Sequence, residues 1–380
     1  MRTNKADQVL RGILEAMNSM AKESSYDQLL DYMGLLSDFR EFYLTYWGTN
    51  FDCAYQELLQ MLSTPEMKFF AAAYDADCRG LSKAASSLSE GGVQLNPSLK
   101  GQVVRAGFLR KSGSVSDSRK ICSELIRQYP ESQSVLSEIF MCDVAERFWA
   151  KDYYWFLNEI QKNRQPRVYI EIGVATGKSL ALAQGKTRAL GVDPVAAEIS
   201  RLVFHSLQNN PQLYKITSDD FFNSLDLKHE MGCECFDLAF IDGLHHFDQV
   251  LRDFINVERL AGPNSVVLIH DCLPVDQRVA TRDRSTAFWT GDVWRIIPCL
   301  RALRPDLEIV TLPLAPAGLA MIKKLDPGSN VLSRHYGSIV EQYEQMILPE
   351  SWEQRCSLLA VDQGQESTNL DQMLLPGAWS

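Results

Sequence analysis

Short apolar runs alternate with helical segments from about residue 143 onward, and this alternation restricts the fold more than any other feature of the sequence. The runs with strand character are VYIEI (168–172), RALGVD (188–193), YKIT (214–217), FDLAFID (236–242), SVVLIHD (265–271), LEIVTL (307–312) and GLAMIKK (318–324). Strands that are apolar throughout are typical of a parallel sheet with helices on both faces. The last two runs are close enough in sequence to pair as an antiparallel unit. We therefore expect an α/β fold built on a mostly parallel sheet.

The first 142 residues follow a different pattern, in which apolar residues recur at helical spacing. Two such sets are Leu10, Ile13, Leu14 and Met17, and Leu29, Leu30, Met33 and Leu36. Thr64-Pro65-Glu66 is a typical helix start, because proline has no N–H to lose at the first helical position and the acid faces the positive helix end. The clearest loop signal is SEGGVQLNPSLKG at 88–100.

These patterns divide the chain into three parts. We expect an all-helical N-terminal domain over 1–142, an α/β domain over 143–328, and a C-terminal helix with a loose tail over 329–380. Within the α/β domain, helices are expected near 178–184 and 195–208. The C-terminal helix should cover about 331–347.

Composition excludes several classes of protein. A formal charge of −10 argues against broad nucleic-acid binding, which needs a basic face. The N-terminus lacks the apolar core of a secretory signal, and no apolar run reaches the roughly 18 residues of a membrane span. Nine scattered cysteines suit a reducing compartment. We therefore expect a cytoplasmic protein that binds neither nucleic acid nor membrane.

The loop in VYIEIGVATGKSLALA, at 168–183, ends in Gly-Lys-Ser and so invites comparison with a phosphate-binding loop. A triphosphate loop has four residues between its glycines, whereas three separate Gly173 from Gly177. The first Gly-x-Gly pair of a dinucleotide fingerprint is also missing. Glu171 would lie beside the ligand, where its charge repels anions and attracts a cation. The loop therefore favours a ligand with a cationic part and no phosphate.

Read as E-x-G-x-x-x-G, the loop resembles motif I of class I S-adenosylmethionine-dependent methyltransferases. The resemblance implies a Rossmann-like, seven-stranded sheet and S-adenosyl-L-methionine as cofactor. It further implies that Asp193, which ends the second strand, accepts the ribose hydroxyls, and that Ser218 and Asp219 meet the adenine amino group. The cofactor-binding residues expected on this basis are Glu171, Gly173, Thr176, Gly177, Ser179, Asp193, Ser218, Asp219 and Asp242.

The stretches FDLAFIDGLHHFDQVLRDF and SVVLIHDCLP resemble a subgroup of these enzymes that carries I-D-G-x-H and then H-D or D-D. That subgroup includes O-methyltransferases acting on sugar hydroxyls of macrolides and related small molecules. Leu244 departs from the pattern, because many relatives carry a polar residue there. The resemblance covers roughly 143–325 and leaves the N-terminal helices without a role.

Two ways of activating an acceptor hydroxyl fit the expected catalytic residues Asp242, His245 and Asp271. In the first, Asp242 and Asp271 hold a Mg²⁺ ion that lowers the pKa of the hydroxyl. In the second, His245 or its neighbour His246 is the general base. His270 should face away from Asp271, as a histidine of the core.

The loop after the fifth strand offers further candidates. Trp289 and Asp292 could form a wall over the site, whereas Trp294 fits core packing. Three arginines, Arg278, Arg282 and Arg284, suit a solvated loop better than a substrate contact.

Several functions therefore stay open. The first is S-adenosylmethionine-dependent O-methylation of a small-molecule or glycan hydroxyl. Its alternatives are metal-independent methylation at nitrogen or carbon, and a non-catalytic interaction protein with a vestigial cofactor site. A triphosphatase would bind ATP through Lys178. The helical domain could also join two copies of the chain into a homo-oligomer.

Overall fold

The computed structural model describes residues 30, 31, 33, 34, 37, 38 and 41 and the ranges 64–196 and 211–364. The chain divides into two compact units, Met1–Glu146 and Arg147–Ser380. The first helical set predicted from the sequence, Leu10 to Met17, lies outside the described residues, as does nearly all of the helix expected at 195–208. None of the described helices is long and apolar enough to cross a membrane.

The first unit is helical where it is described. Its helices are α4 (Pro65–Cys78), α5 (Ser82–Leu95), α6 (Leu99–Lys111), α7 (Val115–Gln128) and α8 (Gln133–Arg147), and neighbours in sequence from α4 to α7 pack on one another. The predicted start at Pro65 is confirmed. The Arg110 guanidinium donates twice to the Glu138 carboxylate, at 2.6 and 3.2 Å, and so ties α6 to α8.

The loop expected at 88–100 is wrong for most of its length, because α5 continues through both glycines to Leu95. A Cβ at Gly92 would lie 2.6 Å from the ring of Phe70, a fully buried residue of α4. The glycine pair is therefore where α5 approaches α4 closely. The loop between α5 and α6 is limited to residues 96–98.

The second unit is built on a sheet of seven described strands. They are β1 (Val168–Ile172), β2 (Arg188–Val192), β3 (Gln212–Tyr214), β4 (Phe236–Ile241), β5 (Ala261–His270), β6 (Glu308–Leu312) and β7 (Leu319–Lys323). Their order is β3-β2-β1-β4-β5-β7-β6, with β7 antiparallel to both neighbours and every other pair parallel. This confirms the predicted Rossmann-like fold class and the antiparallel end unit.

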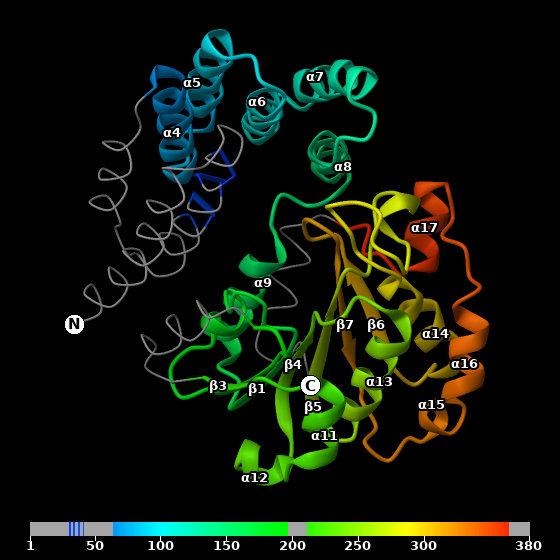
Figure 1. The fold of residues 1–380 in the computed structure, drawn as a ribbon. Helices are drawn as coiled ribbons and strands as arrows, with labels where there is room; N and C mark the ends of the chain where they lie inside the picture. Colours follow the sequence, from blue (N-terminus) through cyan, green and yellow to red (C-terminus); the bar gives the residue numbers. More distant parts are fainter. Residues whose placement is uncertain are drawn as a thin grey trace. The chain divides into compact units, whose positions relative to one another are not determined.

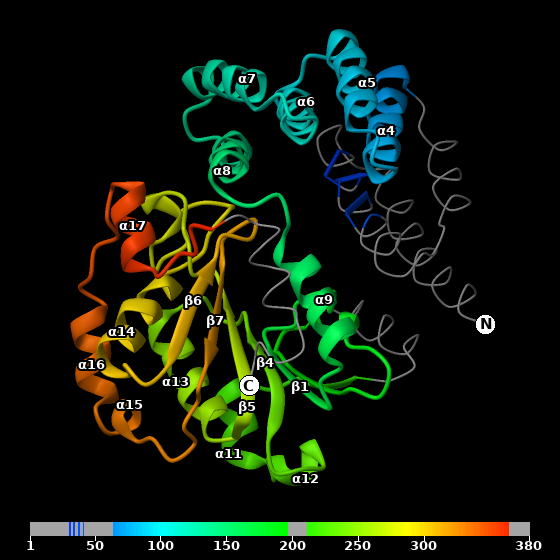
Figure 2. The same cartoon turned by 180° about the vertical axis from the view of Figure 1, so that it is seen from behind.

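Helices cover both faces of the sheet (Figures 1 and 2). The longest are α9 (Tyr153–Arg164), on one face, and α13 (Phe247–Glu258), on the other, where α14 (Ile296–Leu303) and α16 (Tyr336–Tyr343) also lie. The shorter ones are η1 (Leu180–Leu182), α11 (Ser218–Ser224), α12 (Leu227–Met231), η2 (Gln277–Val279), η3 (Val293–Arg295), α15 (Val331–Arg334) and α17 (Trp352–Leu358).

Strand β1 shows how the apolar runs serve both layers. Val168, Ile170 and Ile172 belong to the core that includes the apolar side of α13. Tyr169 and Glu171 point to the opposite face, as the strand period of two requires, and they too are buried. A strand buried on both faces must be apolar at nearly every position, so Glu171 is an exception with its own explanation, given below.

Three predicted elements need correction. After β1 the chain forms only the short turn η1 instead of a helix over 178–184. The third strand, expected at 214–217, lies at Gln212–Tyr214, and Ser218 and Asp219 begin α11. The C-terminal helix is broken into α15 and α16, and α17 follows it. The predicted domain boundaries at 142 and 328 remain predictions.

Candidate active site

The carboxyl ends of β1, β2, β4 and β5 open into one cavity of about 670 Å³. Parallel sheets place loops of successive strands at this edge, which is where ligands bind in such folds. The expected site residues that line the cavity are Gly173, Thr176, Ser179, Asp193, Ser218, Asp219, Asp242, His245 and Asp271. Glu171 and Gly177 are the expected residues that do not line it.

Both glycines of the loop after β1 adopt left-handed backbone conformations, with φ of 86° at Gly173 and 84° at Gly177. A Cβ at Gly173 would lie 1.9 Å from the carbonyl oxygen of Asp242, so no other residue fits beside the end of β4. At Gly177 the N–H donates to the carbonyl of Val174 at 2.7 Å and closes the turn. The glycines thus bring β1 and β4 together at the cavity.

Asp193 fixes the same loop from the neighbouring strand. Its Oδ2 accepts hydrogen bonds from the backbone N–H groups of Val174 and Ala175, at 3.0 and 2.8 Å. Its Oδ1 accepts from the N–H of Val195 at 2.8 Å. A carboxylate has about four lone-pair positions, so Asp193 keeps acceptor capacity beyond these three hydrogen bonds.

Glu171 lies beneath the loop and not beside the ligand. Its side chain is fully buried, and it accepts hydrogen bonds from the hydroxyls of Tyr169 and Ser179, both at 2.6 Å. Burial raises the pKa of Glu171 to about 8, although both hydroxyls act against that shift. Burial therefore favours the neutral acid, and because Glu171 does not line the cavity, the expectation that it lies beside the ligand is wrong.

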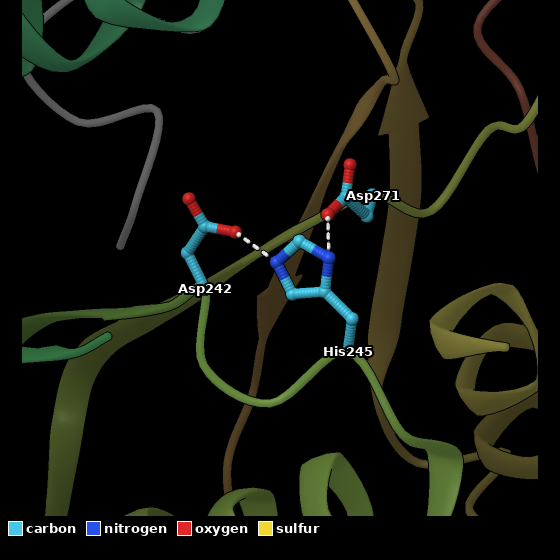
Figure 3. Close-up of side chains that lie close together, drawn as sticks. All are labelled: Asp242, His245 and Asp271. Atoms are coloured by element: carbon cyan, nitrogen blue, oxygen red, sulfur yellow. Dashed lines mark ion pairs between the residues drawn. The ribbon is translucent and has the colours of Figure 1, made fainter. Parts of the chain in front are cut away.

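Asp242, His245 and Asp271 meet at the ends of β4 and β5 (Figure 3). The imidazole of His245 stands between the two carboxylates, with Nε2 3.3 Å from Asp242 and Nδ1 3.0 Å from Asp271. Burial alone would lower the pKa of His245, but Asp271 and Asp242 raise it to about 9. In the ligand-free protein this imidazole is therefore a cation held by two acids.

His270 joins this group, so the expectation that it faces away is wrong. Its Nδ1 lies 3.3 Å from Asp242 and 3.4 Å from Asp271. Its ring packs on Tyr153 at 4.2 Å, and its Nε2 is buried without a hydrogen-bond partner. The strand alternation fails here because β5 ends at His270 and Asp271 takes a φ of 61°, which turns its side chain back to the same side.

The two strand-end turns carry backbone strain. His245 and Asp271 both have left-handed φ values, 60° and 61°. Such a conformation costs a non-glycine residue on the order of 1–3 kcal/mol, and surrounding contacts must hold it in place. Strain of this kind is concentrated at functional sites.

The other end of the cavity contains two residues that sequence reasoning missed. Gln249 on α13 donates from Nε2 to Ser218 Oγ at 3.1 Å and to Asp253 Oδ1 at 3.0 Å. Burial raises the pKa of Asp253 to about 6. The only signal in the sequence was the four-residue spacing of two polar residues on the buried side of an amphipathic helix.

Aromatic rings form much of the remaining wall. Trp289 stacks on the imidazole of His245 at 5.4 Å, and Phe288, Tyr153 and Tyr154 also line the cavity. Asp292, expected to share this wall, is instead fully buried behind it.

The other loop residues follow the sequence reading. Trp294 is a core residue, as expected. The three arginines are engaged outside the cavity: Arg278 with Asp276, Arg282 with Asp248 and Glu344, and Arg284 over the Trp289 ring.

The same cluster was tested for its fit to a divalent cation. One ligand atom from each of Asp242, His245 and Asp271 can be chosen so that all lie within 4.8 Å of one another. The carboxylates suit a hard cation, whereas imidazole suits transition metals better than Mg²⁺. The imidazole would also have to turn, because its two nitrogens now face different carboxylates.

Residues 170–272 match a family model described as a methyltransferase domain. The match runs from β1 to just past β5 and so includes Gly173, Asp193 and the Asp242–His245–Asp271 cluster. It confirms the enzyme class expected from the sequence, an S-adenosylmethionine-dependent methyltransferase. No curated protein is similar enough to the chain to count as a match.

Solved structures show more distant likenesses to this chain. An O-methyltransferase from Bacillus cereus in complex with SAH is 17% identical, with 50% of this chain and 90% of that chain covered and a TM-score of 0.35. An O-methyltransferase from Streptomyces achromogenes involved in tomaymycin synthesis, in complex with SAM, is 18% identical, with 44% and 78% covered and a TM-score of 0.35. An SAH-bound methyltransferase from Podospora anserina is 15% identical, with 55% and 86% covered and a TM-score of 0.35. Identities this low and TM-scores below 0.5 carry no functional argument for this chain.

Proposed function

We propose that this chain transfers a methyl group from S-adenosylmethionine to a hydroxyl group of a small molecule or glycan. The observation that carries the proposal is that one cavity contains both the loop fixed by Asp193 and the cluster of Asp242, His245 and Asp271. A cofactor site and an acid–base group must share a cavity for group transfer, since the two substrates have to meet.

The charges of the cavity suit this cofactor. Its lining contains the carboxyl groups of Asp193, Asp219, Asp242, Asp253 and Asp271, and among the lining residues Lys178 is the only lysine or arginine. Such a lining favours a cation such as a sulfonium and disfavours the phosphates of ATP. Asp193 would accept the ribose hydroxyls, and Ser218, Asp219 and Gln249 lie where polar groups of adenine could bind.

S-adenosylmethionine supplies the methyl group on a positively charged sulfur, which leaves with the electron pair of the broken C–S bond when the acceptor oxygen attacks the methyl carbon. His245 would accept the hydroxyl proton at Nε2, because Nδ1 is buried against Asp271. Nε2 now lies 3.3 Å from Asp242 and would have to face the acceptor hydroxyl instead. Asp242 and Asp271 would then stabilise the imidazolium that forms. For this step His245 must first be neutral, and a sulfonium in the same cavity lowers its pKa by charge repulsion.

A metal-assisted form of the same reaction uses the same residues. Asp242 and Asp271 would hold the cation, with His245 as a nitrogen ligand, and the cation would lower the pKa of the acceptor hydroxyl. Mg²⁺ fits the two carboxylates, and the imidazole shifts the preference toward a transition metal.

The acceptor class is proposed from the cavity wall and the sequence. Acidic groups and the rings of Trp289, Phe288, Tyr153 and Tyr154 favour a neutral or cationic acceptor with an apolar face. The I-D-G-x-H and H-D stretches at 241–245 and 270–271 resemble enzymes that methylate sugar hydroxyls.

Calorimetry of the purified chain with S-adenosylmethionine and, separately, with ATP tests the cofactor. We expect sub-millimolar affinity for S-adenosylmethionine and none for ATP. The reverse result, or no binding of either, would overturn the proposal. Turnover in EDTA then separates the two forms of the reaction: full activity supports His245 alone, and a loss that Mg²⁺ or Mn²⁺ restores supports the metal.

A further inference from the structure

The loop that follows β5 reaches across the end of the sheet and contacts the turn that carries His245. His245 is held in a left-handed conformation with a φ of 60°. Three residues of the loop, Trp289, Gly291 and Asp292, contact this turn from outside.

Asp292 contacts the turn at two points, one on either side of His246. Its backbone N–H donates to the carbonyl oxygen of His245 at 3.2 Å. Its Oδ1 accepts from the N–H of Phe247, the first residue of α13, at 2.6 Å. The side chain is fully buried, and its Oδ2 pairs with Arg295. Asp292 therefore connects the residues immediately around the imidazole to a buried ion pair.

Gly291 and Trp289 also contact this turn, and together with Asp292 they form what we call the brace. Gly291 has a φ of 63°, and a Cβ there would lie 1.9 Å from the carbonyl oxygen of His245. The Trp289 ring covers the imidazole, with an angle of 25° between the planes, and its Nε1 donates to the carbonyl of Thr281 at 2.7 Å. The imidazole is thus enclosed by the loop on one side and by two carboxylates on the other.

We propose that Asp292 is a positioning residue: it holds the turn of His245 so that the imidazole stays between Asp242 and Asp271 and under Trp289. The inference rests on the proposed function in one respect only, which is the role of His245 as the general base. A purely structural role for Asp292, as a cap that starts α13, would stabilise the helix without setting the place of the imidazole.

Carbon-13 labelling of the histidine rings distinguishes these roles without any acceptor. The chain has six histidines, and His245→Gln assigns the His245 signal by its loss. In the wild type, the ring current of the Trp289 indole should move the chemical shift of this signal away from that of a free histidine. We expect Asp292→Ala to remove most of the displacement. Asp292→Asn should keep most of it, because its amide oxygen still accepts from Phe247.

A matched control is Asp226→Ala, which removes a cap at the start of α12. Asp226 Oδ1 accepts there from the backbone N–H of His229 at 3.2 Å. This variant should leave the His245 signal unchanged. An unchanged His245 signal in folded Asp292→Ala would overturn the inference. Should that variant not fold, Gly291→Ala tests the same brace, since the added methyl must move the His245 carbonyl; no shift there would overturn it equally.

Cofactor binding separates this result from the proposed function. We expect Asp292→Ala to bind S-adenosylmethionine within about twofold of the wild type, because Asp292 does not line the cavity. If the wild type fails to bind the cofactor, the proposed function falls, whereas the histidine spectra still decide the role of Asp292.

Discussion

At the scale of single residues, Glu171 is the clearest example of a site whose chemistry depends on burial. Its pKa of about 8 lies above its ordinary value of 4.5, so between these values the folded chain keeps a proton that the unfolded chain has lost. Stability should therefore fall as pH rises through this window, by up to about 1.4 kcal/mol per pH unit. Glu171→Gln imitates the protonated acid and should remove this part of the slope. Urea unfolding at pH 5 and pH 8 measures the difference between the two proteins, and equal slopes would contradict it.

The charge of His245 predicts that activity, unlike stability, rises with pH. A general base works only when neutral, and the pKa of His245 in the ligand-free protein is about 9. We expect kcat/KM for the cofactor to rise with pH up to about 9, since this parameter reports the free enzyme. The corresponding rise in kcat should occur at lower pH, because the bound sulfonium repels the imidazolium. His245→Gln should abolish this rise with pH and lower kcat by about 10²–10⁴-fold. If kcat/KM of that variant still rises with pH, the titrating group is not His245.

Residue types at strand ends were predictable from sequence, whereas their directions were not. Asp193, Asp242 and Asp271 follow apolar runs, and parallel strands bring such positions to one edge. The turn of His270 toward Asp242 depends on the left-handed backbone of Asp271, and no local pattern encodes that conformation. Gln249 and Asp253 were missed because a helix supplies them, and a search along strand ends passes over helices.

At the scale of elements, six of the seven described strands were predicted well, whereas β3 and the helix α5 were not. The runs of the central strands are apolar because both of their faces are covered, and this signal is strong. In α5, Gly91 and Gly92 were taken for a loop because glycine weakens an isolated helix. Packing against Phe69 and Phe70 of α4 overrides that preference.

Gly92→Ala tests this explanation. Alanine favours helices by about 1 kcal/mol over glycine, but its Cβ would meet the buried Phe70 ring at 2.6 Å. We expect a net loss of about 1–3 kcal/mol in the free energy of unfolding. Gly337→Ala in α16 is the matched control, because nothing lies within 4 Å of the added Cβ, and it should stabilise by up to about 1 kcal/mol. Denaturant unfolding of both variants checks the signs, and stabilisation by Gly92→Ala would refute the close packing.

At the scale of the whole molecule, the segment after β7 is part of the core of the second unit. Leu332, Ile339, Tyr343, Leu348 and Leu359 are buried in the same cluster as the sheet. The chain then runs along β6, where the N–H of Thr311 donates to the carbonyl of Ala360, and the N–H of Asp362 donates to that of Thr311, both at 2.9 Å. This backbone pairing covers the edge of β6 at Thr311, which would otherwise be open to pairing with another chain. The sequence pattern showed a helix here but not this edge contact, because pairing of distant segments leaves no local signal.

Two adjacent residues of this segment allow a direct test of its contribution. Leu348 is 4% exposed and packs in the core, whereas Ile347 is 82% exposed. We expect Leu348→Ala to lower the free energy of unfolding by about 2–5 kcal/mol, through lost burial and the cavity left behind. Ile347→Ala removes a side chain of the same size from the surface and should change stability by less than about 0.5 kcal/mol. Both are measured by urea unfolding of the full chain, with tryptophan fluorescence as the signal. If the two substitutions cost the same, the segment is not packed in this core, and the covering of β6 loses its support as well, because the chain reaches that edge only through Leu348 and α17.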